Sequence, residues 1–417
     1  MKIEELKQKH EIYDIFLQLV QIPSPSLHEE NVSDKILELL NISNISVQKD
    51  EYGNVIAKVQ ATDSTKSPLA FSAHMDVVGD DSPINVKISD DGKYIETDKK
   101  RTLGADDKAG VAAAVAIARN IAKSTITHGG LELIFTRDEE QNISGIKNLN
   151  PKMLDSKYIL VLDSDRLGDI MTSGAGYTIG FLKVNTFKGG HSGIDIGDTS
   201  RANAVKLIAE LVNEIPQGII KKDDSGTITS INVGTIVGGG VDSAINKLID
   251  KADKSLDFAK FIFENAVTNV INTSAYATYS IRSSSKSEEE KLISGINEIV
   301  KTFNEKHKEV AKAEFLAKVH MLPFEKSDDE FIVKLSQEAA NEIGLKYYTG
   351  SFHAGAETHI YKYYENAKGE KMLPYLYGAA NVYNMHSSDE KIEIESMEKG
   401  YEILRKIFLK FNEKQTS

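Results

Sequence analysis

The sequence contains no cysteine and no tryptophan, and only 8 of its 417 residues are proline. Without cysteine there are no disulfides and no thiolate-bound zinc, so any metal must be held by His, Asp and Glu. No apolar run reaches the roughly 18 residues that a membrane span needs. The charged start, MKIEELKQKHEIYD, also lacks the apolar core of a secretion signal. We therefore expect no membrane partner and a cytoplasmic location.

Positive charge is in deficit. Lys and Arg total 50 against 62 Asp and Glu, a net charge of −12. This balance argues against nucleic acid as a partner. Hydrophobic residues make up 41% and charged residues 27% of the chain, which is typical of a globular protein, and the length allows two or three domains.

The stretch Gly104–Ala113, GADDKAGVAA, places Asp106 and Asp107 directly before a predicted helix. Alone, such a pair is most often a helix cap. Three other segments change that interpretation, because each is apolar and ends in side chains that can bind metal: residues 68–76 (PLAFSAHMD), 131–140 (LELIFTRDEE) and 158–165 (YILVLDSD). A further histidine, His386, follows in a late loop, NVYNMHSSDE.

Buried strands separated by helices predict an α/β fold with a mixed, mostly parallel sheet and helices on both faces. Ligands of such sheets bind beyond the carboxyl ends of the strands, where these polar residues would meet. From about residue 178 the order strand-helix-strand-strand-helix-strand predicts a ferredoxin-like α+β unit. We therefore predict one domain over 1–177 and 323–417, with a second inserted over 178–322. We also expect a single helix over 2–21 and an extra helix or insertion over 246–270.

The convergent side chains suit a pair of divalent ions about 3.5–4 Å apart that share a carboxylate and a water. The candidate ligands are two imidazoles and three carboxylates: His74, Asp106, Glu140, Asp163 and His386. Asp76 lies two residues after His74 and is placed to fix its tautomer. Glu139, beside a ligand, is left over as a general base. The ions expected are two zinc ions, with manganese or cobalt as alternatives.

Seven stretches resemble the co-catalytic zinc aminopeptidase family, which includes peptidase T, the aminoacyl-histidine (cytosol non-specific) dipeptidases, and the acetylornithine and succinyl-diaminopimelate deacylases. They are SAHMD, TLGADDKAGVA, FTRDEE, LDSD, FKGGHSGIDIGDTSRANA, FHAGAE and NMHSSDE. The resemblance spans about residues 15–410. GGHSGIDIGDTSRANA and HAGAE are most similar to the aminoacyl-histidine dipeptidases, whereas the length is nearer to peptidase T.

The resemblance assigns roles to the candidate residues. One metal would be held by His74, Asp106 and Asp163, and the other by Asp106, Glu140 and His386. Asp76 would orient His74, Glu139 would activate the water between the metals, and the peptide bond Asp106–Asp107 is expected to be cis. The first domain becomes the dizinc catalytic domain, and the inserted one a lid or dimerisation domain.

The resemblance also implies residues that bind substrate. His191 matches an oxyanion donor and Arg282 an arginine that binds the substrate carboxylate. The family's Gly-Gly, three residues, Asn-x-Ile-Pro segment is altered here, so Asn269 is a candidate for the substrate-binding Asn, with a simple turn residue as the alternative. His353 is a candidate by its motif position alone. The role of the segment 241–268 stays open.

Three functions remain possible. The first is a metal-dependent peptidase that hydrolyses di- or tripeptides through a metal-bridging water and a Glu base. The second is an N-acyl amino acid deacylase on the same dizinc site, and the third a metal-binding protein without turnover. The expected partner is a small peptide. A homodimer through the lid domain would allow His191 to act on the partner's site, and closure of the lid over its own chain's metals is the alternative.

Overall fold

The computed structural model describes residues 2–223, 226–238 and 267–415. The predicted helix or insertion over 246–270 and the segment 241–268 therefore lie largely outside the described residues. The chain forms two compact units. Unit 1 comprises residues 1–174, 324–352 and 356–417, and unit 2 comprises residues 175–323 and 353–355. The sequence placed the boundaries at 177/178 and 322/323 and did not assign residues 353–355 to the inserted unit.

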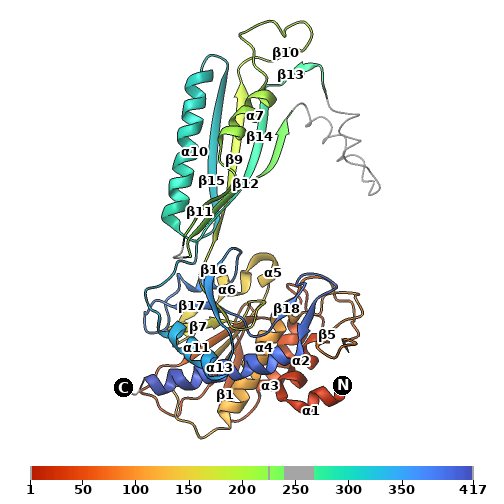
Figure 1. Ribbon diagram of the computed structural model, residues 1–417, viewed down its shortest axis with the longest axis vertical. Coiled ribbons are helices and arrows are strands. Elements are labelled where there is room, and N and C mark those ends of the chain that lie inside the picture. The colour runs from red at the N-terminus through yellow and green to blue at the C-terminus, as the bar shows by residue number, and fades with distance from the viewer. Residues whose placement is uncertain (1, 224–225, 239–266, 416–417) are drawn as a thin grey trace. The chain divides into compact units, whose positions relative to one another are not determined.

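An eight-stranded sheet forms the centre of unit 1 (Figure 1). In spatial order its strands are β1 (Ile45–Lys49), β2 (Val55–Val59), β6 (Leu131–Thr136), β3 (Leu69–His74), β7 (Tyr158–Val161), β17 (Leu373–Tyr377), β8 (Asp169–Gly174) and β16 (Tyr348–Phe352). β3 runs parallel to β6 and β7, β7 to β17, and β8 to β16, whereas the remaining neighbours are antiparallel. The predicted mixed, mostly parallel sheet is confirmed.

Both faces of this sheet are buried, which explains why its strands read as continuous apolar runs. Leu133 and Phe135 of β6 face one apolar cluster, and Ile134 between them faces another. The first cluster is completed by α2 (Glu11–Val20), α3 (Glu30–Leu40), α4 (Ala105–Ala122), α11 (Phe331–Glu342) and α13 (Ile394–Lys414). The second includes residues of α6 (Ser144–Asn148) and α12 (Thr358–Tyr361).

The predicted helix over 2–21 is wrong as a single element. The structure has α1 (Ile3–Lys9) and α2, separated by His10 in an extended conformation with φ −155°. The Nδ1 atom of His10 accepts the backbone N–H of Ile12 at 3.1 Å, so the side chain caps a new helix. A polar side chain that satisfies a free backbone donor favours a helix start over continuation.

Several short strands and turns of unit 1 flank the loops that carry candidate site residues. β4 (Lys87–Ile88) and β5 (Tyr94–Glu96) form an antiparallel hairpin around residues 90–92. β5 also pairs with β19 (Lys391–Glu393), which pairs with β18 (Val382–Tyr383). The connection between β18 and β19 carries His386. The 3₁₀ turn Pro151–Met153 and the single turn α5 (Glu139–Asn142) follow β6 in the chain.

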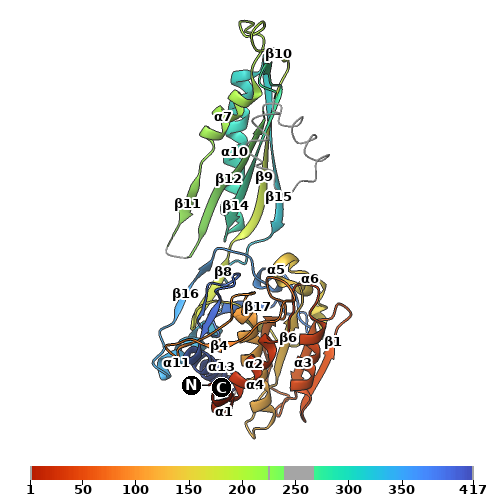
Figure 2. The ribbon, with the colours of Figure 1, turned by 90° about the vertical axis from the view of Figure 1, so that its right-hand side faces the viewer.

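Unit 2 has an antiparallel five-stranded sheet (Figure 2). In spatial order its strands are β11 (Gly218–Lys222), β12 (Ile228–Gly238), β14 (Ser274–Ser283), β9 (Gly176–Thr186) and β15 (Ala311–Met321). The helices α7 (Ala204–Glu214) and α10 (Lys286–His307) pack on this sheet and share its apolar cluster. The predicted strand-helix-strand-strand-helix-strand order is present, with β11 as an additional edge strand. β10 (Gly190–His191) and β13 (Val270–Ile271) form a separate antiparallel sheet of two short strands in the same unit.

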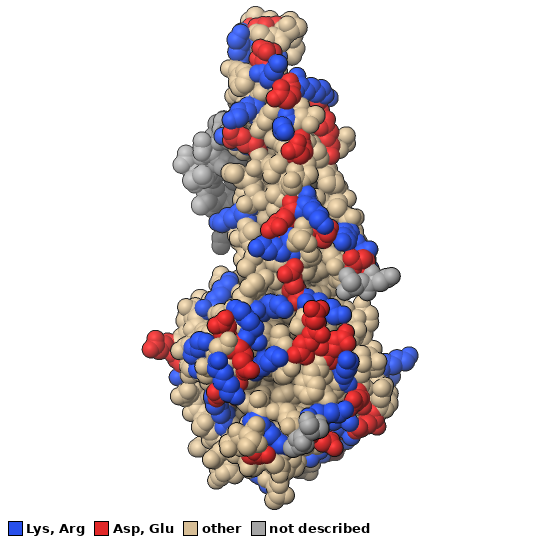
Figure 3. All heavy atoms as spheres, turned by 90° about the vertical axis from the view of Figure 1, so that its left-hand side faces the viewer, with Lys and Arg blue, Asp and Glu red and all other residues tan. Residues whose placement is uncertain are grey.

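Strands of unit 2 alternate between buried and accessible residues. In β9, Leu182 and Val184 are buried, whereas Phe181, the residue directly before Leu182, is 43% exposed. No helix in the described part of the chain combines the length and apolarity of a membrane span. On the face drawn in Figure 3, Lys and Arg side chains lie among Asp and Glu side chains on both units.

Candidate metal centre

The five predicted metal ligands come from separate segments of unit 1. His74 is the last residue of β3, and Asp163 follows β7 by two residues. Glu140 lies in α5, directly after β6, and Asp106 lies in the first turn of α4. These segments meet because parallel β3, β6 and β7 end at the same edge of the sheet. His386 reaches them from the loop between β18 and β19.

Asp106 lies between two groups of potential ligands. Its Oδ1 atom is 3.2 Å from Nε2 of His74, which in turn is 3.7 Å from Oδ1 of Asp163. Its Oδ2 atom is 3.1 Å from Nε2 of His386, which is also 3.1 Å from Oε2 of Glu140. In each group the ligand atoms lie within 4.8 Å of one another. One carboxylate thus offers one oxygen to each group, the arrangement of a bridging ligand.

The backbone around Asp106 is held by a buried carboxylate from the His386 loop. Glu390 accepts the N–H groups of Gly104 at 2.6 Å and of Asp106 at 3.1 Å, and it also accepts the hydroxyl of Thr102. Gly104 has a φ of +76°, and a Cβ there would lie 2.7 Å from Val77. The Asp106–Asp107 peptide bond is cis, as the resemblance implied. Glu390 therefore connects the loop of one ligand to the loop of another.

His74 is oriented mainly by a backbone group. Its Nδ1 atom lies 3.0 Å from the main-chain carbonyl oxygen of Asp76 and 3.5 Å from the carboxylate Oδ1 of the same residue. Nδ1–H donating to that carbonyl leaves the Nε2 lone pair free for a metal. The Asp76 carboxylate instead accepts the N–H groups of Glu139 at 2.9 Å and Glu140 at 3.2 Å, and the Ser26 hydroxyl at 2.7 Å.

Burial and mutual repulsion raise the pKa values of several acids in the site. Burial, followed by the charge of Asp163, raises the pKa of Glu139 well above its usual range. Burial also raises the pKa of Glu140 to about 7 and that of Asp163 to about 6, with the charge of Asp106 acting in the same direction. For Asp106, burial opposes ionisation, but hydrogen bonds with His386 and His74 outweigh it and lower the pKa.

The neighbouring carboxylates favour the charged form of the two imidazoles and so raise their pKa values as well. A hydrogen bond with Asp106 raises the pKa of His386 to about 9. Burial disfavours the charged form of His74, yet contacts with Asp106, Asp163 and Asp76 raise its pKa well above the usual value. Among the described residues, the Oδ2 atom of buried Asp107 has no hydrogen-bond partner. Buried carboxylates gathered this densely are costly without cations, and divalent ions bound to these His and carboxylate groups would remove that cost.

Two of the predicted substrate residues lie side by side in unit 2. His191 of β10 pairs with Val270 of β13, and the backbone N–H of Ser192 donates to the carbonyl of Asn269 at 3.0 Å. Nδ1 of His191 faces the N–H groups of Gly193 at 3.1 Å and Ile194 at 3.3 Å. With Nδ1 as acceptor, Nε2 carries the proton and can donate a hydrogen bond. His191 and Asn269 are both exposed.

The other two also lie close to one another in unit 2. The guanidinium of Arg282 is 4.7 Å from the ring centre of Tyr177, and its Nη1 atom is buried with no partner among the described residues. Nε2 of His353 is 2.9 Å from the hydroxyl of Ser230. Burial, followed by the charge of Arg282, lowers the pKa of His353. A cation with an unsatisfied donor beside a neutral imidazole is suited to an anionic ligand group.

Sequence reasoning missed two buried carboxylates near the site. Glu390 follows His386 by four residues in NMHSSDE, and Glu357 lies in FHAGAE, where it accepts the hydroxyl of Ser72 at 3.1 Å. Burial raises the pKa of Glu357 to about 7. Both acids lie inside stretches that carry the family resemblance, but neither was assigned a role from the sequence alone. An acid without an assigned role inside such a stretch was the signal that could have pointed to them.

The model of peptidase family M20/M25/M40 matches residues 70–410, which is most of the chain and includes every candidate ligand. The chain belongs to this family. Relatives of the chain include proteins named peptidase T and cytosol non-specific dipeptidase, so the predicted resemblance is confirmed. The protein is therefore a hydrolase of the M20 peptidase family.

Among curated relatives, uncharacterized protein YqjE of Bacillus subtilis (strain 168) is 24% identical over 400 residues, covering 93% of this chain and 95% of the relative. The cytosol non-specific dipeptidase of Escherichia coli (strain K12) is 29% identical over 231 residues, covering 48% of this chain and 46% of the relative. Among solved structures, aminopeptidase PepT from Bacillus cereus ATCC 10987 has a TM-score of 0.79 at 22% identity, covering 96% of this chain and 98% of that one. This likeness confirms the fold.

The M20 family is metal-dependent. A further solved structure, the YXEP protein of Bacillus subtilis, is described as a dinuclear metal-binding peptidase of the family. It has a TM-score of 0.65 at 12% identity and covers 98% of this chain and 99% of that one. The two ligand groups that share Asp106 give this chain residues that fit such a pair of metals.

Proposed function

We propose that this protein is a dizinc peptidase that releases the N-terminal residue from di- or tripeptides. The observation that supports this most directly is the position of Asp106, with one carboxylate oxygen toward His74 and Asp163 and the other toward His386 and Glu140. Two divalent ions, zinc in this proposal, would polarise the scissile carbonyl and acidify the attacking water when bound.

Glu139 acts as the general base. It is next to the ligand Glu140 in α5, and its backbone is held by Asp76. Its raised pKa brings a carboxylate closer to the range in which it can both take and return a proton near neutral pH. It removes a proton from the attacking water and passes it to the leaving amine. The peptide C–N bond breaks, and the products are an acid and a free amine.

Substrate recognition is assigned to four residues of unit 2. Nε2–H of His191 donates to the oxyanion that develops on the scissile carbonyl, since its Nδ1 is occupied by backbone donors. Arg282 binds the terminal carboxylate of the peptide, because it has a buried Nη1 donor with no partner within the described residues. Asn269 and His353 contact the substrate backbone in this proposal, on the warrant of their positions beside His191 and Arg282.

The substrate class is supported by what related proteins are called. Relatives include a cytosol non-specific dipeptidase and several proteins named peptidase T, and a solved tripeptidase from Staphylococcus aureus subsp. aureus mu50 has a TM-score of 0.76 at 22% identity. We propose a cytoplasmic location on the same basis, with a small peptide as the partner and neither nucleic acid nor membrane.

A substrate panel tests the proposal. A free dipeptide, a free tripeptide, an N-acetylated dipeptide and a C-amidated dipeptide are each incubated with zinc, manganese or cobalt, and again after chelation. We expect cleavage of the free peptides alone, abolished by chelation. Cleavage of the acetylated member alone would move the activity to deacylation of N-acyl amino acids. No cleavage by the fully metal-loaded protein would contradict the peptidase proposal and favour metal binding without turnover.

We also propose a homodimer formed through unit 2. A mixing experiment asks whether the two chains share a site. Asp106→Ala lacks the bridging ligand, and His191→Ala lacks the oxyanion donor, so each variant is expected to be inactive alone. If His191 acts on the partner's metals, mixed chains recover up to about a quarter of wild-type activity, because one of the two sites in half of the dimers is then complete. No recovery in verified mixed dimers would contradict sharing.

A further inference from the structure

The turn that carries Glu139 and Glu140 is fixed through three successive backbone N–H groups. The N–H of Asp138 donates to Oε1 of Glu29 at 3.0 Å. The next two, of Glu139 and Glu140, donate to the two carboxylate oxygens of Asp76. Every one of these donors therefore ends on a buried carboxylate. Asp76 was expected at this site from the sequence, whereas Glu29 lies far from it in the chain.

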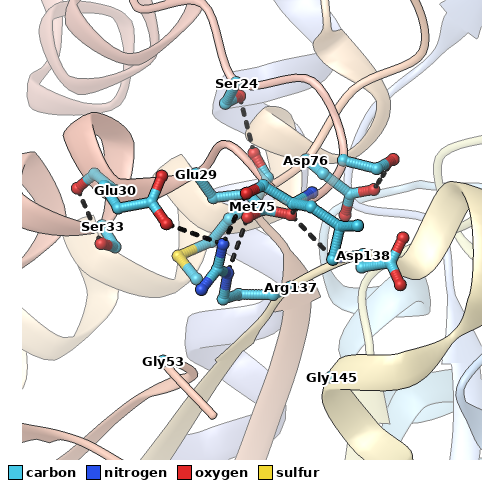
Figure 4. A network of polar contacts seen from close by, with 12 residues as sticks. Ser24, Glu29, Glu30, Ser33, Gly53, Met75, Asp76, Arg137, Asp138 and Gly145 are labelled. Carbon is cyan, nitrogen blue, oxygen red and sulfur yellow. Dashed lines mark hydrogen bonds and ion pairs between the residues drawn. The ribbon is translucent and has the colours of Figure 1, made fainter.

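Glu29 is completely buried and is paired with one cation. Its Oε2 atom accepts Nε–H of Arg137 at 2.6 Å, and its Oε1 atom also accepts the N–H of Leu27 at 2.8 Å. Figure 4 shows the guanidinium of Arg137 between Glu29 and Glu30. An ionised carboxylate taken out of water is costly unless it is paired and hydrogen-bonded, and here both oxygens are satisfied.

Arg137 is itself fixed on every side. Its guanidinium also donates to the carbonyl oxygens of Leu27 at 2.9 Å and Tyr52 at 3.3 Å. Its backbone N–H donates to Asn54, and a Cβ at Gly145 would lie 2.3 Å from its carbonyl oxygen. The ion pair Glu29–Arg137 therefore joins the loop before α3 to the end of β6, directly before the turn.

Such support is needed because the turn starts from an unfavourable backbone conformation. Asp138 has a φ of +50°, in the left-handed region that non-glycine residues seldom occupy. Its carboxylate accepts the side chains of Asn142 and Ser144, but its N–H depends on Glu29. Conformations of this kind persist only where the surroundings determine them.

We propose that Glu29 is a positioning residue for the general base and for one metal ligand, acting through the N–H of Asp138 and the ion pair with Arg137. This rests on the proposed dimetal site. Loss of Glu29 should displace Glu139 and Glu140 while leaving His74, Asp106 and Asp163 in place, because those three are held by other elements. The expected signature is selective, with weaker binding of one metal and slower turnover.

The test compares Glu29→Gln with Glu30→Gln. Both replace a carboxylate on the same guanidinium by its isosteric amide, but the Glu30 side chain is 62% exposed and accepts no backbone N–H in the described structure, so it is the matched control. Zinc is titrated calorimetrically into each metal-free variant, and Glu140→Gln identifies which binding event belongs to the group of Glu140. These titrations need no substrate.

For Glu29→Gln we expect the Glu140 event to weaken about 10–100-fold, the usual effect of losing support behind a metal ligand. The other event should change less than about threefold, and kcat should fall more than KM rises. Glu30→Gln should match the wild type within about twofold, as surface ion pairs contribute little. If Glu29→Gln does not fold, Arg137→Lys, which keeps the charge but loses the Nε–H donor, should show the same selective loss.

Two results would overturn the proposal. One is wild-type zinc binding by a folded Glu29→Gln or Arg137→Lys variant. The other is equal weakening of both binding events together with a lower unfolding temperature, which indicates a general structural role. Failure of the proposed metal site looks different, since Glu140→Gln would then leave both zinc events unchanged.

Discussion

The predicted metal ligands of unit 1 and the predicted substrate residues of unit 2 differ in how firmly the fold holds them. Asp106 is buried, and its backbone N–H is bound by Glu390, while Asp76 binds the backbone of Glu139 and Glu140. His191, on a two-residue strand pair, and Asn269, directly before the second strand of that pair, are exposed. The proposed metal site is thus supported by buried hydrogen bonds to its backbone, whereas these two proposed substrate contacts lie at a short and exposed strand pair.

This difference has a physical origin. Ligand carboxylates that repel one another need buried hydrogen-bond partners to stay in place, so each reactive turn has acquired its own support. A residue that binds substrate needs free donors instead. The unpartnered Nη1 of Arg282 is one such donor in the described part of unit 2. We therefore expect different kinetic and metal-binding effects from three kinds of variant: those of the proposed general base, those of residues that support a metal ligand, and those of proposed substrate contacts.

The largest effect is expected for Glu139→Gln. The amide cannot accept a proton, and a general base typically contributes about 10²–10⁴-fold, so kcat should fall by that factor. KM should change little, because Glu139 is neither a proposed metal ligand nor a substrate contact. Steady-state kinetics on a free dipeptide measure both values.

Bound metal must be determined in the same samples. Glu139→Gln is expected to bind two equivalents of zinc, whereas Glu140→Gln, its neighbour in α5, should bind one site more weakly. A loss below about tenfold in kcat with both metals present would show that another group takes the proton.

The next largest effect is expected for Glu390, which holds the backbone of a proposed metal ligand and takes no part in the proposed reaction. Glu390→Gln removes the negative charge that binds the N–H groups of Gly104 and Asp106, so the bridging ligand should be less well fixed. We expect the affinity for both metals to fall about 10–100-fold. Competition with a chromophoric chelator measures it. Asp389→Asn is the control, because the adjacent Asp389 pairs only with Lys99 at the surface among the described residues and should have almost no effect. Equal affinities for the two variants would rule out this role of Glu390.

The fold was predictable where hydrophobic pattern alone decides it. The runs of β3, β6 and β7 are buried on both faces, and the alternation of β9 reflects a sheet covered by helices on one side. The break between α1 and α2 was not predictable in this way, because it depends on one hydrogen bond that the side chain of His10 accepts from the backbone N–H of Ile12. Such a bond leaves the spacing of apolar residues unchanged. β11 was also missed, since an exposed edge strand carries little hydrophobic signal.

The candidate site was predictable where a residue type has few structural roles at its position in the fold. His and Asp at the ends of apolar strands are unusual enough to point to metal, and the geometry brings all five candidate ligands together. Glu29 and Glu390 were missed because an acid in a polar loop looks like any solvated residue until its burial is known. The orientation of His74 by a backbone carbonyl could not be foreseen either, since main-chain groups leave no mark in a sequence.

Recognition should respond to Arg282→Lys without loss of metal. Lysine keeps the charge but not the planar pair of donors that matches a carboxylate. We expect KM for a free dipeptide to rise about tenfold or somewhat more, in line with one charged hydrogen bond, and kcat to change little. The C-amidated dipeptide, which lacks the carboxylate, provides the control, and its poor cleavage should be the same in both proteins. An equal loss on both substrates would mean that Arg282 does not bind the terminal carboxylate.

The smallest effect is expected from a change in pH, which should alter metal affinity but not KM. Metal binding requires deprotonated ligands. The pKa of His386 is raised to about 9, so below that pH the metal held by Asp106, Glu140 and His386 must displace the proton of His386, and the affinity for that metal should fall about tenfold between pH 8 and pH 7. Below pH 7 the fall should steepen, because Glu140, with a pKa of about 7, then also holds a proton. In unit 2 the pKa of His353 is lowered, so this residue stays neutral over the same range and KM measured at saturating metal should remain flat. Zinc affinities from chelator competition at half-unit pH intervals, compared with KM in the same buffers, measure the two trends. A pH-independent metal affinity, or a KM that follows it, would remove the distinction between a titrating metal centre and a neutral recognition site.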